Sequence, residues 1–292
     1  MPDAHAHLAL LAEPERVVER AAAAGVGPIV AVSMDARDSE ATLRLRERHP
    51  GLVLAAIGLH PSRVTELGPG EARAQFRMIE SLAASADCIG EVGLDYKDAR
   101  TQEERAVQQE LLALQLDLAR RVRKPVNLHT RRADRELLQT AEEFRRESGC
   151  GALLHWFTHS MKLARRAAEA GCLVSCGPSV LLTRPLPSES AAGAAPGGPS
   201  SLDVAASVPP GALLVETDTP VEYGPLGAAE PSWARRVLEA IAARMSLQSG
   251  ADAERVAAAL AASVAENLER WRLSPDRSAG PAAERPFPRG PS

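Results

Sequence analysis

The sequence predicts a single (β/α)8 barrel of the TIM type, and its length and its pattern of apolar runs carry that prediction. The chain has 292 residues, which is long for an ordinary domain but normal for one such barrel. Eight short aliphatic runs alternate with longer amphipathic runs, which implies a parallel sheet that can close. The composition agrees: 45% of the residues are apolar but only 3% are aromatic, so alanine, leucine and valine must pack helices against buried strands.

Each expected strand is a short aliphatic run, as parallel strands covered on both faces require. The expected strands cover Pro2–His5, Pro28–Ser33, Leu52–Gly58, Cys88–Val92, Pro125–His129, Ala152–His155, Cys172–Cys176 and Ala212–Thr217. Helical periodicity between and after them predicts helices over Glu13–Ala24, Ser39–Glu47, Glu71–Ala84, Gln102–Arg123, Arg132–Glu147, Ser160–Ala170, Ser232–Ala243, Asp252–Ala261 and Glu266–Trp271.

We expect one domain over residues 1–273, interrupted once. Residues 185–200 read PLPSESAAGAAPGGPS and contain almost no large apolar side chain, so we expect a disordered insertion between the seventh and eighth strands. Because that position lies at the end of a barrel where active sites form, a lid is the alternative. Residues 274–292 are similarly rich in proline, and we expect a disordered tail.

Charge and composition narrow the class of protein. The net charge of −4 argues against a generally basic surface that coats DNA, although a local basic patch leaves nucleic acid open as a substrate. No apolar run approaches the roughly 18 residues of a membrane span, and no secretory signal is visible. The four cysteines lie in or beside apolar runs, as buried thiols of a reducing compartment do. We therefore expect a cytoplasmic protein without membrane contacts.

Five of the seven histidines fall at or just after the ends of expected strands, and these five are His5, His7, His60, His129 and His155. In a parallel barrel the carboxyl ends of all strands converge on one mouth, where catalytic groups collect. His5 and His7 are two residues apart, so their side chains share one face of a strand. Two neutral imidazoles in that position can hold one divalent ion.

Carboxylates reach the same mouth. Glu91 ends the fourth strand in CIGEVGLDY, where an unpaired charge would have a large desolvation cost that a bound cation removes. A salt bridge to an arginine is the alternative. We expect Gly90 and Gly93 to leave room for metal and substrate near the backbone. Asp95 is interpreted as a group that orients the loop or a ligand.

The eighth strand supplies Glu216 and Asp218 in LLVETDTP. Asp218 lies nearer the mouth and is the better ligand or base, while Glu216 is expected to orient a ligand. These groups exceed what one tetrahedral ion needs, so we expect two divalent ions, Mg²⁺, Mn²⁺ or Zn²⁺, with Glu91 bridging them. Glu91 and Asp218 are then the catalytic residues, and Asp218 would accept the proton of the water that attacks a phosphodiester.

The ordered motifs DAHAHL, GLHP, GEVGLDY, NLHTR, LHWF and ETDTP resemble the TatD family of metal-dependent deoxyribonucleases, within the amidohydrolase-like barrel superfamily. The similarity covers residues 3 to about 272. It implies a distorted barrel with a two-metal site and 3′–5′ exonuclease or endonuclease activity on DNA. The metal ligands that it implies are His5, His7, Glu91, His129, His155 and Asp218. His60 would face a phosphate or support a ligand, and Arg131 would contact a phosphate.

We expect a hydrolase that acts as a monomer on DNA ends or single-stranded DNA. The alternative keeps the metals but hydrolyses an amide, ester or lactone in a small molecule; many enzymes of that type bridge their ions with a carboxylated lysine, and no lysine ends a strand here. A metal- or nucleotide-binding module without catalysis is a third hypothesis, and the complete ligand set argues against it. His159 stands where the family often has glycine and would narrow the cleft.

Overall fold

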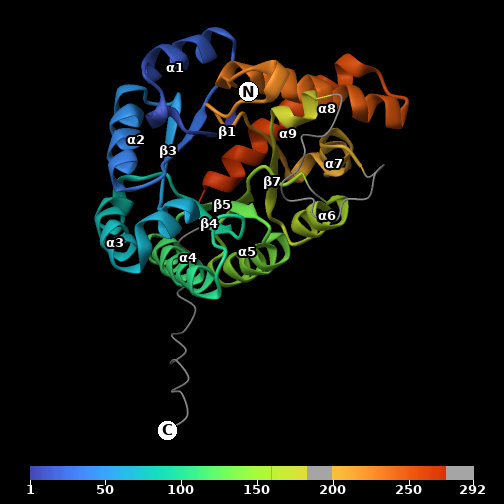
Figure 1. Cartoon of the computed structure of the whole chain (residues 1–292). Helices are drawn as coiled ribbons and strands as arrows, with labels where there is room; N and C mark the ends of the chain where they lie inside the picture. The colour runs from blue at the N-terminus through green and yellow to red at the C-terminus, as the bar shows by residue number, and fades with distance from the viewer. Residues whose placement is uncertain (159, 183–198, 274–292) are drawn as a thin grey trace.

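The structure, a computed structural model, describes residues 1–158, 160–182 and 199–273. In these residues eight parallel strands pair in chain order from β1 to β8, and helices surround them (Figure 1). The strands are β1 (Asp3–Ala6), β2 (Ile29–Val32), β3 (Val53–Ile57), β4 (Cys88–Asp95), β5 (Val126–Arg131), β6 (Ala152–Leu154), β7 (Leu173–Cys176) and β8 (Leu213–Val215). The predicted (β/α)8 barrel is confirmed, and β4 and β5 extend further toward the mouth than expected.

The barrel closes between its first and last strands. Ala6 and Thr219 form a parallel bridge. Beside it, the backbone N–H of Asp218 donates to the carbonyl of His5 at 2.9 Å, and that of His7 donates to the carbonyl of Thr219 at 2.7 Å. These bonds join β1 to the segment after β8 directly at the predicted site.

The described helices lie outside the sheet and follow the predicted order. They are α1 (Pro14–Ala23), α2 (Ala36–Arg48), α3 (Pro61–Leu82), α4 (Gln102–Val122), α5 (Asp134–Ser148), α6 (Met161–Glu169), α7 (Ser201–Ser207), α8 (Ala234–Ser249) and α9 (Ala253–Arg272). Local sequence fixes several starts. At α4, Thr101 Oγ1 accepts the N–H of Glu104 at 3.1 Å while the Glu104 carboxylate accepts the N–H of Thr101 at 2.8 Å.

Three helices differ from the prediction in their start, number or existence, and α8 ends at Ser249 rather than at Ala243. α3 begins ten residues early, with Pro61 in its first turn, because His60 caps it; a kink at Gly68, where φ is 72°, interrupts the helical pattern in the sequence. α9 is one helix rather than two, since Val264 continues its buried face without a break. The short α7 was not predicted, although Ser200 and Asp203 form a capping box at its start.

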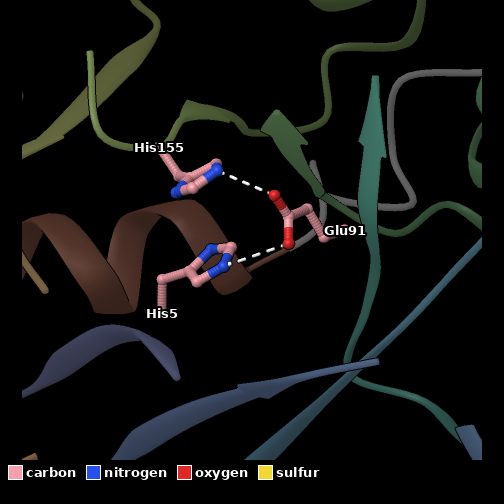
Figure 2. Close-up of side chains that lie close together, drawn as sticks. All are labelled: His5, Glu91 and His155. Atoms are coloured by element: carbon pink, nitrogen blue, oxygen red, sulfur yellow. Dashed lines mark ion pairs between the residues drawn. The ribbon is translucent and has the colours of Figure 1, made fainter. Parts of the chain in front are cut away.

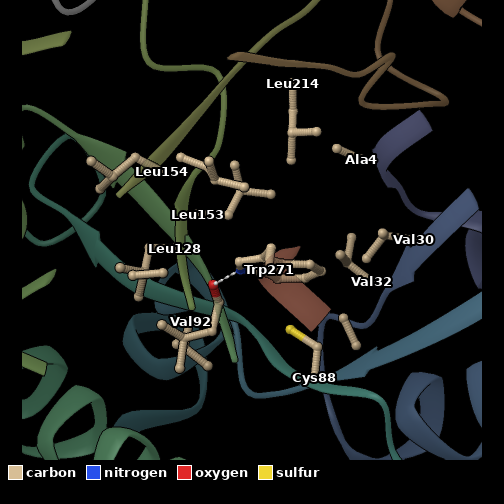
Figure 3. Close-up of a cluster of buried hydrophobic side chains, with 14 of the residues drawn as sticks. Ala4, Val30, Val32, Cys88, Val92, Leu128, Leu153, Leu154, Leu214 and Trp271 are labelled. Carbon is tan, nitrogen blue, oxygen red and sulfur yellow. Dashed lines mark hydrogen bonds between the residues drawn. The ribbon is translucent and has the colours of Figure 1, made fainter. Parts of the chain in front are cut away.

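The end of the barrel opposite the mouth is filled by Trp271 of α9. Its indole Nε1 donates to the carbonyl of Val126, the first residue of β5, at 3.2 Å. Figure 3 shows the ring among aliphatic side chains from several strands, including Val30, Leu153 and Leu214. This end of the barrel is therefore apolar and closed.

Replacing Trp271 with alanine is expected to lower the free energy of unfolding by about 3–5 kcal/mol, because the side chain is only 3% exposed and the cavity cannot fully collapse. The melting temperature should then fall by roughly 10 °C. Trp233→Ala is the control: Trp233 is half-buried, so its replacement should lower the free energy of unfolding much less. A melting temperature unchanged in the Trp271 variant would contradict this account of the barrel floor.

Within the described residues, none of the helices has both the length and the apolar composition needed to cross a membrane. The expectations for His159, for most of the 185–200 insertion and for the 274–292 tail concern residues outside the described ranges.

Candidate metal centre

The first group of donors gathers around β1 and the end of β8. The Nε2 atoms of His5 and His7 lie 3.6 and 3.4 Å from Asp218 Oδ1. The same two nitrogens lie 3.2 and 3.3 Å from Glu91 Oε2. All four side chains are buried. The predicted HxH pair therefore points into the barrel mouth, together with both predicted catalytic carboxylates.

The second group gathers around the other oxygen of Glu91. Glu91 Oε1 lies 2.6 Å from His129 Nδ1 and 2.8 Å from His155 Nε2. Figure 2 shows the carboxylate between His5 and His155, with one oxygen directed at each ring. The two oxygens thus face different histidines, which is the arrangement that a bridging carboxylate needs.

A β-bulge directs Glu91 into the mouth. The pairing register between β4 and β5 shifts between Ile89 and Val92, so that one extra residue of β4 is accommodated around Gly90 and Glu91. Bulges commonly occur beside active sites, where they re-aim a side chain. The unusual position of Glu91 in an apolar strand thus has a local backbone cause.

The two glycines of this strand make room for β5, which corrects the expectation that they make room for metal and substrate. A Cβ on Gly90 would lie 2.7 Å from the Cβ of Asn127, and one on Gly93 would lie 1.9 Å from the carbonyl oxygen of His129. Gly93 also has φ of +158°. Close packing of β4 on β5 is what brings Glu91 and His129 together.

The residues of the mouth fit divalent ions. Three overlapping sets of donor atoms, each within 4.8 Å of one another, are His5–Glu91–His155, His5–His7–Asp218 and His60–Glu91–His129. His5 Nε2 and Glu91 Oε2 are buried and make no hydrogen bond of acceptable geometry, although they face each other. Unsatisfied buried polar atoms are costly, and a cation among them removes the cost.

The electrostatics of the mouth also favour positive charge at its centre. Burial would raise the pKa of Glu91, but the imidazoles around it, first His60 and then His155, hold that pKa well below its ordinary value. Burial would lower the pKa of His7, yet Asp218 and Glu91 raise it to about 10. Burial would also raise the pKa of Asp218, but its contact with His7 keeps that pKa below its ordinary value, so both carboxylates favour the ionised form that metal ligands need.

In two of the histidines, the ring nitrogen that does not face Glu91 contacts another carboxylate. Asp95 Oδ2 lies 3.4 Å from His129 Nε2, on the side of the ring away from Glu91. Glu216 Oε1 lies 3.6 Å from His155 Nδ1, and its Oε2 accepts the hydroxyl of Ser175 at 2.5 Å. Such partners fix the orientation of metal-binding imidazoles. Both acids lie where the sequence led us to expect supporting groups.

Arg131 follows His129 at the mouth, where the sequence predicts it, and its guanidinium is already engaged. It pairs with Asp95 Oδ2 at 2.9 Å and with Asp98 at 3.3 Å, and its side chain is 34% exposed. In this arrangement Arg131 holds Asp95 against His129. Its contact with a substrate phosphate stays a prediction.

His60 lies close to Glu91 but is oriented as a donor. The N–H of Ser62 donates to His60 Nδ1 at 3.0 Å, so the ring proton of the neutral imidazole is on Nε2. That Nε2 lies 3.3 Å from Glu91 Oε1. Burial lowers the pKa of His60 to about 4, so the ring stays neutral. His60 therefore offers an N–H to the mouth rather than a lone pair, so in this tautomer it does not serve as the ligand that the set His60–Glu91–His129 would need.

Backbone strain accompanies the site. Asp218, Trp156 and Arg132 have φ of 51°, 44° and 62°, values in the left-handed region that residues other than glycine rarely adopt. Each residue comes immediately or shortly after β8, β6 or β5. Such strain persists where the surrounding structure fixes it and is typical of functional sites.

Asn127 is a polar group of the mouth that sequence reasoning missed. It lies two residues before His129 on β5, so the two side chains share a face, and its Oδ1 lies 3.0 Å from His5 Nδ1. An amide that interrupts an aliphatic strand at this spacing from a ligand is the signal that could have identified it.

Comparison with known proteins identifies the family of the chain. The TatD related DNase family matches residues 2–270. The TATDN3 proteins of mouse and human, the human one named a deoxyribonuclease, are 34% and 33% identical over 192 residues, which is 61% of this chain but only 64% and 68% of theirs. A 3′-5′ ssDNA/RNA exonuclease TatD of Erwinia amylovora is 30% identical over 70% of this chain and 73% of its own.

A solved structure supports the same assignment. The YjjV protein of Escherichia coli, named an uncharacterized metal-dependent hydrolase, is 32% identical over 75% of this chain and 78% of its own. Its crystal structure, described as a TatD homologue, superposes with a TM-score of 0.72 at 26% identity, covering 91% of this chain and 97% of that one. The predicted family is therefore confirmed: this chain belongs to the TatD related DNases, a family of metal-dependent hydrolases.

Proposed function

We propose that the protein is a two-metal phosphodiesterase that removes nucleotides from the 3′ ends of single-stranded DNA. The observation that carries the proposal is that the two oxygens of the Glu91 carboxylate face different histidines. Oε2 faces His5 and His7, and Oε1 faces His129 and His155. A carboxylate that ligates a single ion would not need histidines around both of its oxygens.

In this proposal the protein supplies two sets of ligands. His5, His7 and Asp218 would hold one ion, His129 and His155 would hold the other, and Glu91 would be shared between them. When bound, the ions acidify a water molecule and offset the charge of the scissile phosphate. Asp218 would accept the proton of that water, because it is a carboxylate at the mouth that favours the ionised form. Burial would raise its pKa, but the contact with His7 keeps that pKa below its ordinary value.

His60 and Arg131 are proposed to act on the substrate. The fixed Nε2–H of His60 can donate to a phosphate oxygen beside Glu91. Arg131 is half-buried at the rim and can add a second donor while it keeps Asp95 against His129.

The surroundings of the mouth favour a short stretch of substrate. A cavity of about 440 Å³ lies beside it, between the start of α3 and the segment that leads into α4. Its lining includes the carboxylates Glu66, Asp98 and Glu104 against one cation, Arg100. Arg131 and Arg63 pair with two of these carboxylates, Asp98 and Glu66, so the acidic character comes mainly from the whole chain, whose net charge is −4. We propose that the enzyme binds a few terminal nucleotides rather than a long duplex.

We further propose that the protein acts as a monomer in the cytoplasm. All of the donor groups named above come from one chain, so no second copy is needed to complete the site. The four cysteines are buried thiols, which persist in a reducing compartment.

The test is metal analysis combined with degradation of single-stranded DNA labelled at either the 5′ or the 3′ end, in Mg²⁺, Mn²⁺ or Zn²⁺. We expect two ions per chain, immediate release of the 3′ label and a shortening ladder from the 5′-labelled strand. Circular single-stranded DNA, which has no ends, should stay intact. Cleavage of the circle would replace the exonuclease proposal with an endonuclease.

A panel of amide, ester and lactone substrates tests the alternative of a small-molecule hydrolase. We expect no turnover of these compounds by the metal-loaded enzyme that degrades DNA. If instead one of them is hydrolysed while no DNA is released under any metal, the nuclease proposal is wrong and the alternative replaces it.

A further inference from the structure

Asn127 connects β5 to β1 across the inside of the barrel. The side chain is completely buried. Its Nδ2 donates to the carbonyl of Ala4 at 3.2 Å, and its Oδ1 lies 3.0 Å from Nδ1 of His5. One side chain thus contacts both the backbone and the first histidine of β1.

These two contacts decide which nitrogen of His5 carries the proton. A carbonyl oxygen can only accept, so the Ala4 carbonyl keeps the NH₂ group of Asn127 on its side. The amide oxygen then faces His5, where it can only accept the Nδ1–H. The lone pair of the ring is consequently on Nε2, which is the atom that faces Glu91 and Asp218.

Neither leucine nor aspartate, which are close to asparagine in size, meets both requirements. Leucine would offer neither an acceptor to His5 nor a donor to Ala4. Aspartate would still accept the Nδ1–H but would place its second oxygen against the Ala4 carbonyl. The room for the amide depends on the absence of a side chain at Gly90, because a Cβ added there would lie 2.7 Å from the Cβ of Asn127.

We infer that Asn127 is a positioning residue that holds His5 in the tautomer and orientation of a metal ligand. It does for His5 what Asp95 does for His129 and Glu216 does for His155, but with a neutral group. The inference rests on the metal centre of the proposed function, because the orientation of His5 matters to catalysis only through the ion that it would bind.

Three variants separate positioning from simple structural support. Asn127→Leu removes both hydrogen bonds, and Asn127→Asp keeps the acceptor for His5. Asn267→Leu is the matched control: Asn267 on α9 is also buried and donates to two carbonyls, those of Pro210 and Leu213, at 2.7 and 2.8 Å, just before and at the start of β8. Binding of Mn²⁺ and Zn²⁺ to the metal-free protein is measured by titration calorimetry, with melting temperatures in parallel. The ¹⁵N shifts of His5 report its tautomer.

We expect Asn127→Leu to weaken binding of one ion by about 10- to 100-fold and to mix the His5 tautomers. Asn127→Asp should keep the Nδ1–H tautomer and stay within about threefold of wild-type affinity while losing stability. Asn267→Leu should lose stability and keep affinity. If the leucine variant does not fold, Asn127→Ala replaces it, with the same expectation.

Two results would overturn the inference: wild-type affinity in the leucine or alanine variant, or an equal loss in the aspartate variant. A wild-type protein that binds no ion at all would instead remove the metal centre, and with it the proposed function. Failure of the inference alone would leave two-ion binding and DNA release in the wild type intact.

Discussion

Glu91→Ala is expected to abolish DNA hydrolysis and to reduce metal binding from two ions to at most one. Both oxygens of this carboxylate face histidines of the two donor groups, so its loss removes a shared ligand from each. An ion contributes several kcal/mol of charge stabilisation in the transition state, which predicts a loss in kcat/KM of at least about 10³-fold.

Metal-dependent stability gives this prediction a readout that does not depend on activity. Ligand at 100 times its Kd stabilises a protein by about 2.7 kcal/mol, so Mn²⁺ or Zn²⁺ should raise the melting temperature of the wild type measurably. The shift should shrink or vanish in Glu91→Ala. Glu91→Gln, which keeps size and removes charge, should behave like the alanine variant. A Gln variant with normal activity would refute the role of the bridging charge.

Asp218→Asn is expected to lower kcat by about 10²- to 10⁴-fold with a much smaller effect on metal binding. The amide can still offer an oxygen to an ion, but it cannot accept the proton of the attacking water. The contrast between catalysis and metal affinity therefore separates the base function of Asp218 from its ligand function, and single-turnover rates at saturating Mn²⁺ measure it.

Glu222→Gln is the control for this variant, because it removes an exposed carboxylate from the same segment after β8. It should keep wild-type turnover and metal content. If Asp218→Asn retains wild-type kcat at saturating metal, another group accepts the proton. If it loses metal and activity in parallel, Asp218 serves as a ligand alone.

Most of the barrel and of the donor set could be predicted because both depend on local pattern. Buried parallel strands are continuous aliphatic runs, so each of the eight appears in the sequence. A histidine or acid at the end of such a run, as at His155 or Glu91, has no local apolar role and is conspicuous. The polar mouth therefore appears in the sequence even though its members are far apart in the chain.

The features that were missed depend on contacts between distant residues. Asn127 and His5 are 122 positions apart, and the roles of Gly90 and Gly93 appear only when β5 packs against β4. The early start of α3 was hidden for a local reason, because Gly68 and Pro69 interrupt a helix that His60 caps. Periodicity cannot reveal a cross-barrel neighbour.

Barrel closure between β1 and β8 has a consequence for the timing of activity during synthesis. The segments that close the barrel are more than two hundred residues apart, as in the 214-residue separation of the hydrogen-bonded pair Asp3 and Thr217. A growing chain on the ribosome carries His5 and His7 from the beginning, but it lacks Asp218 and the backbone partners of β1 until the eighth strand has been made. Barrel closure and the completion of the donor set thus depend on the same segment, so a chain that stops before the eighth strand lacks both Asp218 and the bonds that close the barrel.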